Sequence, residues 1–156
     1  MTLHPAEPEP EFADQLAGEL RALMAKLRRR LREQASPGDF TPSQTAVLLR
    51  LEREGAGTVS SLARAEGMRP QSMGTVIAQL DAAGLLNGRP DPEDGRQTLW
   101  SLTRACAEWL REGRAKRQDW LSRTIEARLD DDEQRELAAA LDLLQRLVDD
   151  RPRGPA

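Results

Sequence analysis

The chain has 156 residues, enough for one domain or two small ones with a buried hydrophobic core. Its single cysteine, Cys106, excludes an internal disulfide framework and a multi-cysteine zinc site. No apolar run approaches the ~20 residues of a membrane span, and the N-terminus lacks the pattern of a secretory signal, so we expect a cytoplasmic protein. The net charge of −3 argues against a polyanionic partner unless basic residues are placed locally, because arginines and acids balance between Thr41 and Arg104.

The N-terminal part predicts a lead-in and two helices. Residues 1–11 are rich in proline and glutamate, which is typical of disorder. Apolar residues then recur at three-and-four spacing from Phe12 to Leu31, and this predicts one long helix that ends before Ser36. Thr41 as a cap, followed by Pro42 and Gln44, starts a second helix that runs to about Arg53.

Two shorter helices follow. The first opens near Thr58 and ends at Gly67, and the second opens at Arg69-Pro70 and ends at Gly84. The second helix has a predicted buried stripe of Met73, Val76, Ile77 and Leu80, and an opposite polar face of Gln71, Ser72, Thr75 and Gln79. Two short helices joined by a glycine-containing turn indicate a helix-turn-helix.

The remaining chain predicts a hairpin and two further helices. The only strand candidates flank the polar turn in RPDPEDGRQTLWSLT (89–103), where we expect Gly95 to take a positive φ and make the bend. A long helix should run from about Arg104 to Arg128, and a last one, capped by Asp131 or Asp132, should carry an apolar stripe to Val148.

A hairpin directly after a helix-turn-helix is a winged helix, and the order of motifs resembles the MarR family of bacterial transcription regulators. The resemblance spans nearly all of residues 12–148. It is carried by TPSQTAVLLRL (41–51), VSSLARAEGMRPQSMGTVIAQLDAAGLL (59–86), DPEDGR (91–96), SLT (101–103) and the acid-capped last helix.

The resemblance implies a mainly α fold: a winged helix-turn-helix with a two-stranded β-wing, plus terminal helices that form a dimerisation body. It places the DNA-binding domain at 41–103, the dimerisation helices at 12–35 and 104–150, and a tail at 151–156. The leucine-rich stripes at 12–31 and 137–148 also favour a homodimer, because they are too long for a small body to cover. The alternative is that they pack on each other within one monomer.

Candidate DNA contacts follow from this arrangement. The polar face of the helix at 70–80 is expected to enter the major groove, where a glutamine can pair bidentately with adenine. Arg69 at the helix start suits a phosphate. Ser60 and Ser61 begin the preceding helix and could make similar contacts to the DNA backbone, but capping explains a serine there equally well.

In the hairpin, Arg96 is the residue expected to reach into the minor groove. The resemblance gives Asp94 the role of orienting Arg96 or Arg89, although a solvated turn with weak ion pairs is the alternative. Many relatives have a second basic residue where Gly95 stands, so this wing tip is one charge short.

Two kinds of signal are compatible with the sequence, a small-molecule ligand and oxidation of Cys106. The resemblance suggests a small anionic aromatic or phenolic ligand in the cleft between body and winged domain, with these candidate liners: Leu20, Met24, Phe40, Val47, Trp100 and Trp109. Cys106 stands where relatives have glycine, and its place in the first turn of a helix would lower the thiol pKa and favour redox sensing. A small semi-buried hydrophobe is the alternative reading of Cys106.

Catalysis is not expected. The only histidine, His4, lies in the predicted lead-in, Cys106 has no histidine to activate it, and no metal or cofactor motif is present. The sequence thus predicts a homodimeric repressor that binds a pseudo-palindromic operator in double-stranded DNA and is released by a ligand. The alternatives are a redox-responsive regulator acting through Cys106 and a winged-helix protein-interaction module.

Overall fold

The computed structural model describes residues 10–35 and 38–149. Most of the predicted lead-in (1–11), His4 included, and the tail at 151–156 therefore lie outside the described residues. The helices are α1 (Pro10–Gln34), α2 (Pro42–Glu54), α3 (Val59–Glu66), α4 (Pro70–Ala82), α5 (Arg104–Arg128) and α6 (Asp131–Val148). The strands are β1 (Gly57–Thr58), β2 (Leu86–Pro90) and β3 (Thr98–Leu102). Pro10 and Glu11 are helical, so α1 begins two residues earlier than predicted.

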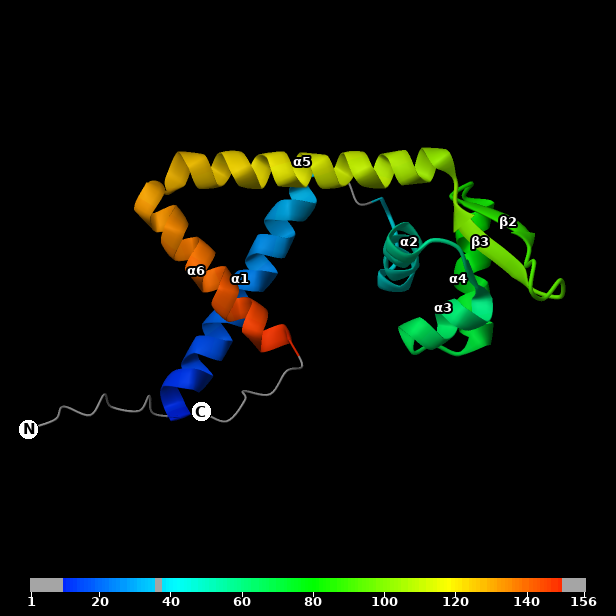
Figure 1. Ribbon diagram of the computed structural model, residues 1–156, viewed down its shortest axis with the longest axis horizontal. Helices are drawn as coiled ribbons and strands as arrows, with labels where there is room; N and C mark the ends of the chain where they lie inside the picture. Colours follow the sequence, from blue (N-terminus) through cyan, green and yellow to red (C-terminus); the bar gives the residue numbers. More distant parts are fainter. Residues whose placement is uncertain (1–9, 36–37, 150–156) are drawn as a thin grey trace, which may run out of the picture.

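Figure 1 shows two groups of elements joined by α5, which runs along the upper edge of the view. The winged lobe consists of α2, α3, α4 and the three strands, and it lies at the N-terminal end of α5. The helical arm consists of α1, α5 and α6. Within the described residues, none of the helices combines the length and the apolar character that crossing a membrane requires.

The sheet has three antiparallel strands in the order β1-β3-β2. β2 and β3 form the predicted wing, with Leu86 opposite Leu102 and Gly88 opposite Trp100. The prediction of only two strands was incomplete, because Gly57 and Thr58 also pair with Trp100 and Leu99. Two residues, one of them a glycine, show no alternation of polar and apolar side chains, so the sequence carried no signal for β1.

Capping interactions fix where several helices begin. Thr41 and Gln44 form a capping box at α2: the Gln44 backbone N–H donates to Thr41 Oγ1 over 3.2 Å, and Gln44 Oε1 accepts from the Thr41 backbone N–H over 2.9 Å. Thr58 and Ser61 form the equivalent box at α3. At α6 the cap is Asp130, whereas the sequence suggested Asp131 or Asp132.

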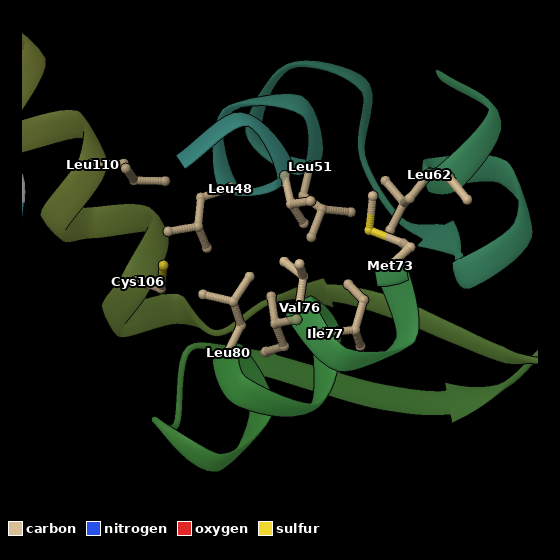
Figure 2. Packing of buried hydrophobic residues seen from close by; sticks show 12 residues of the cluster. Leu48, Leu51, Leu62, Met73, Val76, Ile77, Leu80, Cys106 and Leu110 are labelled. Atoms are coloured by element: carbon tan, nitrogen blue, oxygen red, sulfur yellow. The ribbon is translucent and has the colours of Figure 1, made fainter. Parts of the chain in front are cut away.

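The hydrophobic core lies almost entirely in the winged lobe (Figure 2). The stripe predicted for α4 is buried, as are Val47, Leu48 and Leu51 of α2, and α5 adds Cys106 and Leu110 from its first two turns. The largest fully buried side chains are Leu48, Met73, Leu80 and Val47. By contrast, α6 has no buried residue, and large apolar side chains on α1 and α6 remain exposed.

Thr103 connects the winged lobe to the helical arm. Its hydroxyl donates to the backbone carbonyls of Gly84 and Leu85, at 3.2 and 3.3 Å, and accepts from the Cys106 backbone N–H at 3.3 Å. The Thr103 backbone N–H also donates to the Leu85 carbonyl at 2.9 Å. One residue thus ends β3, caps α5 and holds the turn after α4.

Cys106 packs in this junction and is only 2% exposed. Burial raises the pKa of its thiol, and the nearby Glu52 carboxylate raises that pKa further. The expectation that the helix start would lower the thiol pKa was wrong, since burial and the Glu52 carboxylate raise it.

We expect Thr103→Val to lower the free energy of unfolding by about 1–2 kcal/mol, the usual cost of losing a cap together with a hydroxyl that satisfies backbone groups. Thr103→Ser keeps the hydroxyl and should lose less than half of that. Urea unfolding at fixed protein concentration measures both variants. Equal losses in the two variants would mean that the hydroxyl does not stabilise the junction.

We expect the Cys106 thiol to react with iodoacetamide at pH 8 about tenfold or more slowly than the same thiol in urea, because thiolate is the reactive form. The folded thiol holds its proton more tightly than the unfolded one, so Cys106 should lower stability as the pH rises above ~8.5. Mass spectrometry of timed samples gives the rate. Equal rates in the folded and urea-unfolded protein would contradict the burial of this thiol.

Candidate nucleic-acid interface

The turn between α3 and α4 sets the angle of the helix-turn-helix. Gly67 has φ 64° in the left-handed region, which ends α3 at the predicted glycine. The Met68 backbone N–H then donates to the Ala63 carbonyl over 2.8 Å. Pro70 starts α4, and Arg69 stands at its N-cap without a side-chain cap bond.

The exposed face of α4 carries the four predicted polar side chains, Gln71, Ser72, Thr75 and Gln79. They are not equally available, because the Thr75 hydroxyl donates to the Gln71 carbonyl over 3.3 Å. Gln79 Oε1 accepts from Gln44 Nε2 over 2.9 Å. At the start of α3 the Ser61 hydroxyl is bound within its capping box, whereas Ser60 is exposed and makes no side-chain hydrogen bond within the described chain.

Two aspartate side chains shape the backbone of the wing tip. Asp91 Oδ1 accepts from the Glu93 backbone N–H at 3.0 Å, and Asp94 Oδ1 accepts from the Arg96 backbone N–H at 3.1 Å. The Gln97 backbone N–H donates to the Asp94 carbonyl at 2.9 Å and closes the turn. Gly95 is the second residue of this turn, so the bend lies where it was predicted, but its φ is not positive and that part of the prediction was wrong.

The expected pairing of Asp94 with Arg96 or Arg89 is also absent. Among the described residues, no salt bridge involves any of these three side chains. Asp94 instead binds the backbone, and its second oxygen accepts from Gln97 Nε2 at 3.4 Å. The carboxylate thus shapes the loop and leaves Arg96 and Arg89 exposed.

The Trp100 side chain packs against Gly88 in the wing. A Cβ at Gly88 would lie 2.9 Å from atoms of both Trp100 and Thr98, so only glycine allows this close approach on β2. The ring lines a shallow hollow with Arg89 and Arg96. Trp100 was predicted to line a ligand cleft, and the structure places it in the wing instead.

Arginines of the winged lobe fall into two groups. Arg50 joins α2 to α3: its Nη1 lies 2.7 Å from Glu54, its Nε donates to Glu66, and these two carboxylates, Glu66 first, raise the pKa of its guanidinium. Arg53 also has an acidic partner, as does Arg104 at the start of α5. Within the described residues, the arginines of the lobe without a salt bridge are Arg64, Arg69, Arg89 and Arg96.

A pocket of about 360 Å³ lies where α1, α2 and α5 meet. Phe40 and Trp109 form an edge-to-face pair in its wall, with ring centroids 5.8 Å apart and an interplanar angle of 75°. The apolar lining is completed by Leu31, Leu48, Leu49 and Leu110. The pocket also contains three arginines, Arg28, Arg32 and Arg117.

Only Phe40 and Trp109 of the six predicted liners belong to this pocket. Val47 is fully buried in the core, and Met24 is exposed on α1. Leu20 lies one helical turn before Met24 and also lines no part of the pocket. The three arginines were missed, although the four-residue spacing of Arg28 and Arg32 around Leu31 signalled a shared face of α1.

Comparisons with known proteins agree with this geometry. Residues 40–98 match the model of the MarR family. An HTH-type transcriptional regulator of Mycobacterium bovis is 39% identical over 88% of this chain and 95% of its own length.

Solved structures are similar as well. A putative transcriptional regulator from Pseudomonas aeruginosa PA01 is 39% identical, with a TM-score of 0.73 over 85% of this chain and 94% of that one. BpsR of Bordetella bronchiseptica, whose DNA binding is regulated by 6-hydroxynicotinic acid, shares the fold at 23% identity, with a TM-score of 0.58 over 95% of this chain and 100% of its own.

A helix-turn-helix with a polar outer face, a wing with unpaired arginines and these relatives lead to one identification. The chain belongs to the MarR family of winged helix-turn-helix transcriptional regulators, which are DNA-binding proteins without enzymatic activity.

Proposed function

We propose that the protein is a homodimeric repressor that binds a pseudo-palindromic operator and is released from it by a small anionic aromatic ligand. The observation that carries this proposal is the allocation of arginines in the winged lobe. Arg50 and Arg53 pair with acids, whereas Arg64 and Arg69 of the helix-turn-helix and Arg89 and Arg96 of the wing have no salt-bridge partner in the described chain. Arginines without an acidic partner are available to bind phosphates, which supply much of the affinity for DNA.

In this proposal α4 enters the major groove and Arg96 enters the adjacent minor groove. Arg69 contacts a phosphate from the start of α4, and the exposed Ser60 of α3 contacts the sugar-phosphate backbone of the DNA. Arg64 was not singled out from the sequence, but its exposed position on α3 adds it to the phosphate contacts. A protein-interaction module would have no use for this arrangement.

Dimer formation follows from the apolar side chains that the helical arm leaves uncovered. Leu23 on α1 is 62% exposed, and Leu147 on α6 is 72% exposed. Because both stripes remain exposed, α1 and α6 do not cover each other within one chain. A second copy would bury them and would set two α4 helices about one DNA turn, ~34 Å, apart.

The pocket between α1, α2 and α5 is the proposed ligand site. Its volume lies within the usual range for small-molecule sites, and the edge-to-face Phe40–Trp109 pair suits an aromatic ring. Arg28, Arg32 and Arg117 have no salt-bridge partner among the described residues and suit an anionic group. 6-Hydroxynicotinic acid, which regulates BpsR, has this chemistry.

Release by the ligand would be a population shift. A ligand that binds better to a dimer with a different spacing of its α4 helices draws the protein away from DNA, by no more than its differential affinity. Control by oxidation of Cys106 is the less favoured alternative, because its thiol is buried and its pKa is raised.

We expect Arg96→Ala to weaken binding to all DNA sequences and to reduce the slope of log affinity against log salt by about 1, because one phosphate-proximal cation is lost. Gly95→Lys should do the reverse, since a Cβ at Gly95 meets no atom within 4 Å and its φ is not positive. Fluorescence anisotropy at several salt concentrations measures both slopes.

Arg53→Ala is the matched control, because Arg53 is exposed but pairs with Glu54 away from the wing. It should leave the slope unchanged. An unchanged slope in Arg96→Ala would contradict the wing contact. If the unmodified protein failed to protect any DNA flanking its own coding region from cleavage, operator binding itself would be wrong.

We expect Arg32→Gln and Arg117→Gln to weaken binding of the effective aromatic carboxylate about tenfold, because each removes a charge-assisted hydrogen bond. DNA affinity without ligand should not change. The measurement is titration of ligand-induced DNA release with a panel of phenolic and pyridine carboxylic acids. Arg29→Gln is the control, as Arg29 lies on α1 but not in the pocket. Equal effects at all three positions would exclude this pocket.

A further inference from the structure

Gln44 makes hydrogen bonds that reach from the cap of α2 to the outer face of α4. Its Oε1 accepts from the Thr41 backbone N–H over 2.9 Å, and its Nε2 donates to Gln79 Oε1 over 2.9 Å. Its own backbone N–H donates to Thr41 Oγ1 over 3.2 Å. Gln44 is therefore held by its backbone and by both ends of its side-chain amide.

These contacts determine which end of each amide faces which partner. A backbone N–H can only donate, so the atom of Gln44 that faces Thr41 must be the oxygen. The Gln44 NH₂ group then faces Gln79, and Gln79 must present its oxygen to receive that hydrogen bond. The polarity of the Gln79 amide thus follows from a capping box on another helix.

Gln79 consequently turns its oxygen toward α2 and is left with free donors. Its Nε2 has no hydrogen-bond partner in the described part of the chain, and the residue is exposed on the same face as Ser72 and Thr75. Bidentate pairing with adenine requires the amide oxygen and the NH₂ group to point at the base together, whereas the Gln79 oxygen points toward Gln44 on α2. The sequence-based expectation that this glutamine suits adenine therefore does not fit its orientation.

We propose that Gln44 is a positioning residue that fixes Gln79 as a hydrogen-bond donor toward the major groove. Gln79 then favours guanine, whose N7 and O6 are both acceptors, or thymine O4 at its contact position, over adenine, whose N7 acceptor lies beside an amino donor. This inference rests on the proposed function, because it requires α4 to lie in the major groove.

The test is selection from a random DNA library by the full-length protein, with Gln44→Glu as the decisive variant. A glutamate at this capping position still accepts from the Thr41 N–H, and glutamate is a preferred residue there. Its carboxylate has no donor, so Gln79 must reverse its amide, donate to position 44 and present its oxygen to DNA.

The base position read by Gln79 is the one whose preference disappears in Gln79→Ala. At this position the unmodified protein should select guanine or thymine, and Gln44→Glu should select adenine or cytosine, whose amino groups are donors. We expect a change of about tenfold in base preference, equivalent to one lost and one gained hydrogen bond.

Two controls separate this effect from the added negative charge. Ser43→Glu places the same charge in the same turn of α2 and should lower affinity without changing the selected bases. The double variant Gln44→Glu with Gln79→Ala should behave as Gln79→Ala, because the charge acts on base choice only through Gln79. Thermal unfolding should show that Gln44→Glu retains the stability of the capping box.

Each contrary result has a distinct meaning. If the unmodified protein selects a palindrome but Gln79→Ala changes no position, or if Gln44→Glu keeps guanine or thymine, the inference is wrong and operator binding stands. If Gln79→Ala lowers the affinity for all DNA sequences equally, Gln79 contacts a phosphate and the base assignment is overturned. If the unmodified protein selects no sequence, the proposed function fails together with the inference.

Discussion

The hydrogen bonds of Thr103 determine how the two parts of the molecule relate to each other. The residue ends β3, starts α5 and holds the backbone at Gly84 and Leu85, where the chain leaves α4 for β2. Cys106 and Leu110 then carry the first two turns of α5 into the core of the winged lobe. Because polar bonds and apolar packing act at the same place, α5 leaves the lobe as a rigid extension rather than as a flexible linker.

The acids and arginines of the winged lobe nearly balance in number, but they lie at different places in the lobe. Glu54 pairs with Arg50 within α2, Glu66 pairs with Arg50 from α3, and Glu52 accepts from Arg114 of α5 over 2.5 Å, so the last two pairs connect α2 to its neighbours. Asp91 and Asp94 bind backbone N–H groups of the wing. Most of the acids thus serve the fold, and the arginines left over lie on the helix-turn-helix and the wing. A neutral segment can therefore present a basic surface.

Much of the fold was predictable because its signals are local. Proline at Pro42 and Pro70, threonine caps and the stripe of Met73 to Leu80 specified the helices and their buried faces. The errors arose where several distant residues decide the outcome. The conformation of Gly95 depends on two aspartate side chains, and the thiol pKa of Cys106 depends on burial by the whole lobe. Four of the six predicted ligand-lining residues lie outside this pocket, because a sequence pattern identifies a helix face but not the neighbour that covers it.

The length of α5 gives its junction with the winged lobe a mechanical consequence. Its 25 residues span ~37 Å as one uninterrupted helix, with the pocket residues Trp109 and Arg117 along its first half and α6 at its far end (Figure 1). A rotation of only ~5° about one end of such a lever moves the other end by ~3 Å, close to the ~3.4 Å rise of one base pair. A small change in the angle of α5, which leaves the packing of the winged lobe and of the helical arm intact, is thus large enough to move α4 by about one base pair along the DNA.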